Sequence, residues 1–428
     1  MAACSGNSSN DASSKIYEEL EHVLRKDVME LWYPRAIDTL HGGYLSDFDY
    51  QWRQDGPQNK MIVSQARHVW TCSKLAELYP EGSYIDYASH GVKFLKDTMW
   101  DQEFGGFHSL VRRNGQLIDN AQWGGQKTAY GNSFGIYGLA AYVMATGDTE
   151  TLEFAKKAFR WLEVHSYDPE FGGYFQFISP EGNPRTTGYE EVPPKDQNST
   201  IHLLEAFTEL YQVWPNDTLR DRLEELLLLV RDVITTDRGY MNLFFNQDWS
   251  PVVFKDSLQA IREANYSLDH VSFGHDVETA YLLMESSEVL GIEDETETYR
   301  RGKQMVDHAL NNGWDSKVGG FYDRGYYLSD VEGMTIIADS KVWWSQVEAL
   351  NTLLIMSQLY PDDPRDYYSK FTLQWNYIKS YLLDPVYGGV YVEGIDNDPE
   401  SKTSDKGGIW KVNYHTARSL MNCIENIR

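Results

Sequence analysis

Apolar positions recur along most of this chain with the spacing of amphipathic helices. Within residues 133–146 and 151–166, and again within 279–291 and 299–312, they fall at i, i+3, i+4 and i+7. This period places them on one face of a helix. Two such segments follow each other closely in both stretches. The pattern predicts a mainly helical protein assembled from helix pairs.

A glycine motif separates these helix pairs and occurs six times. Each copy has an aspartate, a short turn, glycine and then an alternating apolar–polar stretch, as in residues 168–182. The copies begin at Asp38, Asp101, Asp168, Asp237, Asp315 and Asp384, and all carry Gly-Gly except the fourth, which has Gly239 alone. Glycine permits the positive φ of a tight turn, and alternation is typical of a short hairpin.

The six copies predict an all-α fold of about twelve helices, two per copy. A closed ring of six inner and six outer helices would bury the apolar stripes of both sets, with the short hairpins at one rim. This architecture is the (α/α)6 barrel. An open helical solenoid is the competing fold, but six copies without polar end repeats favour closure. We therefore expect residues 15–428 to form a single catalytic domain.

Composition narrows the class of protein further. Apolar residues make up 42 % of the 428 residues, enough for one large core. With 64 acidic and 38 basic residues, the net charge is −26. This charge argues against binding nucleic acid or an anionic membrane surface. No run of about 18 apolar residues occurs, so no segment is expected to span a membrane.

The first 14 residues are polar and of low complexity, and they are expected to form a disordered tether. Cys4 follows Ala-Ala and precedes Ser, Gly and Asn, as at the start of a mature bacterial lipoprotein. The alternatives are a lipid-anchored protein of the cell envelope and a cytoplasmic protein with a functionless tail. Cys72 and Cys423 lie in helical patterns and are expected to be inert, because no disulfide framework is present.

Three histidines lie in dense polar motifs, each followed by an apolar helical run. They are His202 in a segment that starts at Asn198, His275 in Ser272-Phe-Gly-His-Asp-Val-Glu278, and His415 in Trp410-Lys-Val-Asn-Tyr-His-Thr-Ala-Arg418. Two further segments, around Arg67 and around Trp344, have the same character. The barrel would place these motifs on different helix pairs, so their side chains could converge on one pocket.

Such a group of residues suits the inversion of a carbon next to a carbonyl. One base removes the proton and one acid returns a proton on the other face, and both work best with a pKa near the working pH. Histidine has an unperturbed pKa of about 6.5. Arg67 and His202 would stabilise the enediolate oxygens as charge develops. This chemistry needs no cofactor.

Less specific interpretations remain open beside this one. A lone helical histidine is more often a satisfied polar residue than a catalyst, and we interpret His68, His90, His108, His165, His270 and His308 in that way, with His41 in a rim turn. The run His275-Asp276-Val-Glu278 could hold a metal. However, the three histidines lack the spacing that places zinc ligands on one helix face, so no metal is expected.

The assembled motifs resemble the N-acylglucosamine 2-epimerase superfamily and, within it, the cellobiose and mannobiose 2-epimerases. The segments SFGHDVE, WWSQVEA and WKxxYHxxR carry the resemblance, which extends over nearly the whole chain after the tail. It implies the (α/α)6 barrel, His275 and His415 as the acid/base pair at C2, His202 near O1 and the ring oxygen, and Arg67 on the oxygens of the opened sugar.

The resemblance also implies a substrate and the residues that bind it. It implies inversion of reducing-end glucose and mannose in β-1,4-linked disaccharides, through ring opening and a cis-enediolate. Residues matching the reducing-end pocket are Tyr130, Asn198, Glu278, Trp344, Glu348 and Trp410, and Trp249 and Asp323 match the contacts of the second sugar. A small-molecule disaccharide is the expected partner, and a monomer the expected state. Val392 departs from the family pattern, and residues 186–197 match it only with a gap.

Three other functions remain to be distinguished. A glycoside hydrolase with this fold would need two carboxylates across the scissile bond, for which Glu278 and Glu348 are candidates. A monosaccharide epimerase or isomerase acting on N-acetylglucosamine or mannose would share the histidines. A non-catalytic sugar-binding protein would have no activity to lose when His275 and His415 are replaced.

Overall fold

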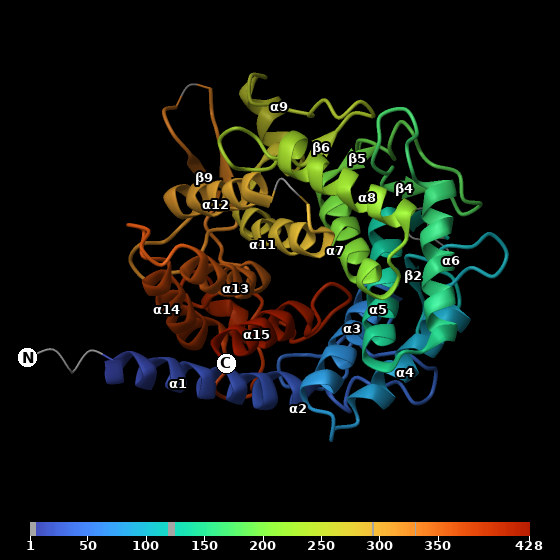
Figure 1. The fold of residues 1–428 in the computed structure, drawn as a ribbon, viewed down its shortest axis with the longest axis horizontal. Coiled ribbons are helices and arrows are strands. Elements are labelled where there is room, and N and C mark those ends of the chain that lie inside the picture. Colours follow the sequence, from blue (N-terminus) through green and yellow to red (C-terminus); the bar gives the residue numbers. More distant parts are fainter. Residues whose placement is uncertain (1–5, 119–124, 293–294, 330) are drawn as a thin grey trace, which may run out of the picture.

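The computed structural model describes residues 6–118, 125–292, 295–329 and 331–428. In this part of the chain, six long helices form an inner ring. They are α3 (Ile62–Leu78), α5 (Ala129–Thr146), α7 (Gln197–Val213), α11 (Phe273–Leu290), α13 (Trp343–Leu359) and α15 (Tyr414–Ile427). Each inner helix contacts the next, and α15 contacts α3 (Figure 1). The ring is therefore closed, which confirms the (α/α)6 barrel and rules out an open solenoid.

An outer ring of helices covers the inner one. Its long members are α1 (Gly6–Val23), α4 (Tyr84–Phe94), α6 (Thr149–His165), α8 (Asp217–Leu228), α12 (Glu295–Asn312) and α14 (Tyr367–Tyr377). Four of them continue directly into a short π-helical segment. These segments are η1 (Leu24–Met29), η2 (Leu95–Met99), η3 (Leu229–Ile234) and η4 (Ile378–Leu382). Shorter helices in the connections are α2 (Glu30–Trp32), α9 (Gln259–Ala264), α10 (Tyr266–Asp269) and η5 (Pro399–Thr403).

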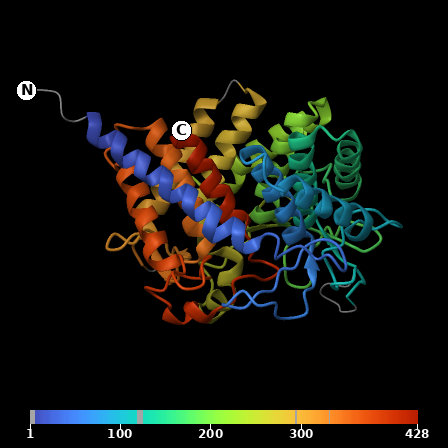
Figure 2. The same cartoon turned by 90° about the horizontal axis from the view of Figure 1, so that it is seen from below.

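The N-terminal helix completes the outer ring from the other end of the sequence. Helix α1 packs against the C-terminal helix α15, whereas every other outer helix follows its inner partner in the chain (Figure 2). The helix begins at Gly6 and so includes residues 6–14, which were expected to belong to the tether. Serine and asparagine have low helix propensity, but these residues precede an amphipathic segment that docks on the barrel. Cys4 lies outside the described residues.

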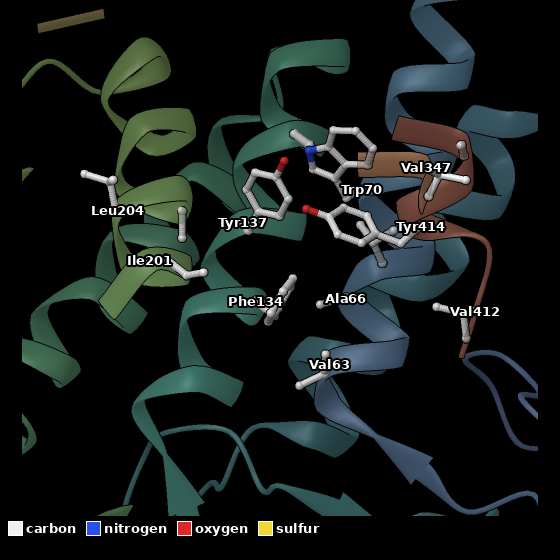
Figure 3. Packing of buried hydrophobic residues seen from close by; sticks show 14 of the residues in the cluster. Val63, Ala66, Trp70, Phe134, Tyr137, Ile201, Leu204, Val347, Val412 and Tyr414 are labelled. Carbon is white, nitrogen blue, oxygen red and sulfur yellow. The ribbon is translucent and has the colours of Figure 1, made fainter. Parts of the chain in front are cut away.

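The inner helices are buried on nearly every side, while the outer ones bury a single stripe. In α5, Gly138 allows α3 to approach closely, because a Cβ there would lie 2.8 Å from the backbone oxygen of Ala66. The rings of Trp70, Tyr137 and Tyr414 meet between α3, α5 and α15, with Trp70 5.4 Å and 5.1 Å from the two tyrosine centroids (Figure 3). Aromatic packing of this kind fills the interior of the ring.

Short strands at one rim connect neighbouring copies of the glycine motif. Strands β1 (Lys60–Met61), β3 (Lys127–Thr128), β5 (Lys195–Asp196) and β7 (Val271–Ser272) each lead into an inner helix. Their antiparallel partners belong to the next copy and are β2 (Leu110–Val111), β4 (Phe177–Ile178), β6 (Phe244–Phe245) and β8 (Arg324–Tyr326), the last also paired with β9 (Thr335–Ala338). A bridge between Val111 and Leu117 closes a local turn as well. The rim therefore contains the expected hairpins and a ladder that joins the copies.

The repeated aspartate has a structural purpose that its spacing alone did not reveal. In five copies its carboxylate pairs with a lysine that precedes an inner helix. The pairs are Asp38–Lys60, Asp101–Lys127, Asp168–Lys195, Asp315–Lys341 and Asp384–Lys406. The same carboxylate accepts backbone N–H groups of its own turn, as Asp168 does from Glu170 at 3.0 Å. Each pair thus holds a glycine turn against the start of an inner helix.

Replacing Lys195 with methionine is expected to lower the free energy of unfolding by about 3–5 kcal/mol, because Asp168 would keep a buried, unpaired charge. The two groups lie 2.8 Å apart, and their side chains are 0 % and 1 % exposed. Urea denaturation measures the change. As a matched control, Lys93→Met breaks an exposed pair with Asp97 and should cost at most about 1 kcal/mol. Equal losses in the two variants would contradict the proposed role of the buried pair.

The described part of the chain contains no helix that is both long enough and apolar enough to cross a membrane.

Candidate active site

The predicted site residues come together at the rim end of the barrel, and each inner helix supplies at least one of them. The six helices contribute, in order, Arg67, Tyr130, His202, His275, Trp344 and His415. The ring of Trp344 lies between two histidines, with centroid distances of 4.7 Å to His275 and 5.7 Å to His415. The ring of Tyr130 lies 5.3 Å from that of His202. Residues that are far apart in the sequence therefore form one group.

Arg67 is held in this group by aromatic rings. Its guanidinium lies 4.5 Å from the centroid of Phe134 and 4.9 Å from that of Tyr414, and its Nη2 donates to the hydroxyl of Tyr130 at 3.3 Å. Phe134 also packs against His202, at 4.8 Å between centroids. A buried cation beside His202 is suited to stabilise negative charge on a substrate oxygen.

Two of the histidines are oriented by carboxylates. The Nδ1 atom of His202 lies 2.9 Å from Oε2 of Glu205, and Nδ1 of His415 lies 2.6 Å from Oε1 of Glu348. An ionised carboxylate only accepts hydrogen bonds, so each Nδ1 must carry the proton. In the neutral ring this leaves Nε2 with a free lone pair. His275 is different, because its Nδ1 contacts the hydroxyl of Ser272 at 2.9 Å.

The pKa values of the two proposed acid/base histidines are both shifted downward. Burial lowers the pKa of His275 to about 3, and nearby histidines contribute to the shift. Burial also lowers the pKa of His415 well below its ordinary value, although the Glu278 carboxylate opposes this. Both rings are therefore neutral near pH 7 in the absence of substrate, as a general base requires.

Next to the histidines lies a cluster of buried charged side chains that was not predicted from the sequence. Arg418 contacts the carboxylates of Glu205, Glu278 and Glu348, and it also donates to the hydroxyl of Tyr414. Arg418 and Glu205 stand three residues after His415 and His202, and this spacing places each pair on one helix face. The spacing was the available signal, but it does not reveal that the residues meet across helices.

The same cluster is the only group in the described chain with donor atoms close enough to hold a metal ion. Donor atoms of Glu278, Glu348 and His415 lie within 4.8 Å of one another. The guanidinium of Arg418 already contacts both carboxylates. A metal ion would have to compete with this fixed positive charge, so the geometry favours a salt-bridged cluster over a metal centre.

A cavity of about 300 Å³ lies beside Tyr130, whose ring packs against His202, but none of the three histidines lines it. Three predicted binding residues line it, namely Tyr130, Asn198 and Trp410, together with Phe177 and Tyr189. Gln176, Glu190 and Asp196 provide polar groups in the same wall. Tyr189 and Glu190 belong to the segment 186–197, which matches the family pattern only with a gap, so the sequence did not indicate them. Aromatic rings beside amide and carboxylate groups suit a sugar, which has apolar faces and polar edges.

The structure places the two predicted second-sugar residues differently. Trp249 is 6 % exposed, and its indole N–H donates to the carbonyl oxygens of Phe171 and Gly172 at 3.2 Å and 3.1 Å. The ring of Trp249 therefore supports a glycine turn, and its contact with a second sugar stays a prediction. Asp323 is half-buried beside Arg324, and Arg324 pairs with Ser272 in the rim ladder.

Comparisons with known proteins agree with this geometry. The model of the N-acylglucosamine 2-epimerase (GlcNAc 2-epimerase) family matches residues 43–419. The chain belongs to this family. Its membership identifies the protein as an isomerase that acts as a carbohydrate epimerase. The matched range contains all twelve residues that the sequence singled out for the site.

Individual members of the epimerase family resemble the chain over nearly its full length. A cellobiose 2-epimerase from Bacteroides fragilis is 27 % identical over 413 residues, which cover 95 % of this chain and 97 % of the relative. The structure of a cellobiose 2-epimerase from Spirochaeta thermophila is 27 % identical, with a TM-score of 0.81 and coverage of 97 % and 98 %. One from Bacillus thermoamylovorans shares the fold at 23 % identity, with a TM-score of 0.83 and coverage of 96 % and 99 %.

Proposed function

We propose that this epimerase inverts C2 of the reducing-end sugar in β-1,4-linked disaccharides, interconverting glucose and mannose at that position. The observation that carries the proposal is the meeting of His202, His275, His415 and Arg67, which come from four inner helices, around Trp344 and Tyr130. Two imidazoles and one guanidinium at a single centre are what proton transfer at a carbon next to a carbonyl requires.

The proposed reaction begins with opening of the pyranose ring, which produces an aldehyde at C1. One neutral imidazole, of His275 or His415, takes the C2 proton, and the electron pair moves onto O1 to give a cis-enediolate. Arg67 stabilises the charge on the oxygens, and His202 does so once its Nε2 has taken a proton, because the neutral ring presents only a lone pair there. After rotation about C2–C3, the other histidine, which has taken a proton from solvent and acts as an imidazolium, returns that proton to the opposite face of C2. The carbonyl re-forms, and the first histidine releases its proton to solvent. The direction of reaction decides which histidine acts as the base.

The two acid/base histidines have different partners, which suits this exchange of roles. Glu348 contacts Nδ1 of His415 at 2.6 Å and can stabilise an imidazolium there once negative charge develops on the substrate. His275 has only the Ser272 hydroxyl at its Nδ1. Glu278 is 1 % exposed, and its Oε2 has no hydrogen-bond partner among the described residues. We propose that this oxygen accepts a hydroxyl of the reacting sugar.

The adjoining cavity supports a disaccharide rather than a monosaccharide as the substrate. We propose that this cavity of about 300 Å³, which reaches the site at Tyr130, receives the second sugar ring. We propose that the half-exposed ring of Trp410 stacks on a sugar face, while Glu190 and Asn198 bind hydroxyl groups. Asp323 remains a candidate contact at the rim. The names of the relatives, cellobiose 2-epimerases, support the same substrate class.

The arrangement of carboxylates argues against a glycoside hydrolase. Such an enzyme places two carboxylates on opposite sides of the scissile bond, about 5 Å or more apart. Here Glu278 and Glu348 both contact Nη2 of Arg418 through their Oε1 atoms. A glycosidic bond has no space between two carboxylates that share one nitrogen.

Incubation with cellobiose, mannobiose and N-acetylglucosamine tests the proposal. Anomeric proton NMR should show new reducing-end signals for both disaccharides, with the glycosidic bond intact. In D2O the product should carry deuterium at C2, because the acid that returns the proton exchanges with solvent. Free monosaccharides would indicate a hydrolase, and turnover of N-acetylglucosamine alone would indicate a monosaccharide epimerase. A product without deuterium would contradict proton exchange through the histidines.

A further inference from the structure

We infer that Arg418 is a positioning residue that fixes the same tautomer in His202 and His415 at once. The inference rests on the proposed acid/base function and extends it to a residue that touches no substrate. Its basis is that the carboxylates held by Arg418 include both carboxylates that bind Nδ1 of a catalytic histidine.

The contacts run symmetrically from Arg418 to the two imidazoles. On one side, Nη1 reaches Oε1 of Glu205, whose Oε2 lies 2.9 Å from Nδ1 of His202. On the other side, Nη2 lies 2.6 Å from Oε1 of Glu348, the same atom that lies 2.6 Å from Nδ1 of His415. Each carboxylate also accepts a hydrogen bond from a tyrosine hydroxyl group. Tyr414 donates to Glu205 at 2.5 Å, and Tyr281 donates to Glu348 at 3.0 Å.

The carboxylates must stay ionised for this arrangement to work. A protonated carboxyl group can donate its hydrogen to Nδ1, and the imidazole proton would then move to Nε2 and block the lone pair that faces the substrate. Glu205, Glu278 and Glu348 are each at most 4 % exposed. Three buried carboxylates without a cation would be driven toward the neutral form by burial and mutual repulsion.

The pKa of Glu285, a neighbouring carboxyl group, shows the effect of burial at a greater distance from the guanidinium of Arg418. Glu205 and Glu285 line one cavity of about 190 Å³ below the site, together with Arg418. Burial and the carboxylates of Glu209 and Glu205 raise the pKa of Glu285 to about 7. Although burial also acts on Glu205, contact with Arg418 and His202 lowers the pKa of that carboxyl to about 2. In Glu348, burial outweighs the same contact and raises the pKa of the carboxyl above its ordinary value, although Arg418 and the Tyr281 hydroxyl oppose the shift. The guanidinium therefore favours the ionised form of both carboxylates, and Glu348 depends on it more strongly than Glu205.

Arg418→Lys tests the inference, because lysine keeps the charge but lacks the planar fork that reaches both sides. The protein is labelled with ¹⁵N-histidine, and long-range ¹H–¹⁵N spectra without substrate report the tautomer of each ring. The signals of His202 and His415 are assigned from single-residue variants. The wild-type enzyme should carry its proton on Nδ1 in both rings, and Arg418→Lys should show Nε2–H forms in at least one. Its kcat should fall about 100-fold or more, as expected for a wrong tautomer, with KM changed less than about 3-fold.

Two further variants separate positioning from simple stabilisation. Arg231→Lys changes a buried arginine of η3 that pairs with Asp232, and it should lower stability while the tautomers of His202 and His415 stay unchanged. Arg418→Gln combined with Glu278→Gln removes one charge of each sign, which keeps the protein foldable if Arg418→Lys does not fold. It should still produce Nε2–H forms.

Unchanged Nδ1–H tautomers in both Arg418 variants, or Nε2–H forms in the wild-type protein, would overturn the inference. These spectra need no turnover. An enzyme that is inactive on every sugar would therefore refute the proposed function and leave the inference to be decided by the tautomers alone.

Discussion

His275→Ala and His415→Ala are each expected to lower the kcat of epimerisation about 1,000-fold or more, because each removes one partner of the proton exchange at C2. Both rings pack against that of Trp344, with centroid distances of 4.7 Å for His275 and 5.7 Å for His415. The variants remove contacts within the site, with Trp344 and, for His415, with Glu348, and they leave the packing between the helices in place, so far-UV circular dichroism should remain unchanged. Initial rates by NMR or chromatography measure the loss. Near-full turnover in either variant would contradict the assignment.

A matched control uses a histidine outside the site. His165→Ala removes a ring at the end of α6 that contacts the carbonyl oxygen of Gly182 at 2.6 Å, and its kcat should stay within about twofold of the wild-type value.

Isotope exchange in these variants adds a test of the two-base mechanism. With one base removed, epimerisation stops, but the remaining histidine can still exchange the C2 hydrogen of the epimer whose hydrogen faces it. We expect His275→Ala and His415→Ala to wash deuterium into opposite epimers of the disaccharide. Exchange into the same epimer in both variants would indicate a single base that serves both faces.

The repeat architecture could be predicted because it follows from local patterns. Helical periodicity gave the pairs, since 133–146 falls within α5 and all of 151–166 except its last residue falls within α6. Six glycine turns gave the number of pairs and thus the closed ring. Two glycines with positive φ, such as Gly172 at 71° and Gly173 at 68°, restrict each turn to one residue type. Such constraints are readable in the sequence because they act within a few residues.

Interactions that cross from one helix pair to another were not predictable in this way. The lysines that pair with the repeated aspartates stand 22 to 27 residues after them in the chain, as for Asp38 with Lys60 and Asp168 with Lys195. The contacts of Arg418 join four inner helices. Neither group has a local signal that distinguishes it from surface charge, which is the more common fate of lysine and arginine. Their roles follow only from burial and distance.

The structural role of Trp249 was not predictable for a related reason. The sequence assigned Trp249 to the second sugar because it matches a loop position at which the family contacts that sugar. Trp161 and Trp52 show the alternative, since their indole N–H groups also donate to carbonyl oxygens just before or within a glycine turn, at Phe104 and Tyr387. Trp249 repeats this contact at the third copy. The sequence shows these tryptophans, but only the structure shows that each one binds a carbonyl oxygen of a glycine turn that is distant in the chain.

Acid is expected to destabilise the barrel through His68, which is fully buried among the rings of Trp32, Tyr33 and Tyr44. Burial lowers the pKa of His68 to about 3, whereas an unfolded histidine titrates near 6.5. Between these values the unfolded chain binds the additional proton, so the free energy of unfolding falls as the pH falls. The contribution of His68 is fully present above about pH 6.5, and about 2 kcal/mol of it should be lost between pH 7 and pH 5.

His68→Phe isolates this contribution from other titrating groups. Urea denaturation at pH 7 and pH 5 should show that the wild-type protein loses about 2 kcal/mol more than the variant over this interval. The nearest titratable groups do not interfere, because burial raises the pKa values of Tyr33, Tyr44 and Cys72 and keeps them neutral. The exposed His41 provides the control, and His41→Asn should retain the wild-type pH dependence. Only a ring that is neutral in the folded protein and protonated after unfolding makes the wild-type protein lose more stability than the variant. If the free energy of unfolding falls equally in His68→Phe and in the wild-type protein between pH 7 and pH 5, His68 is not held neutral by its aromatic surroundings.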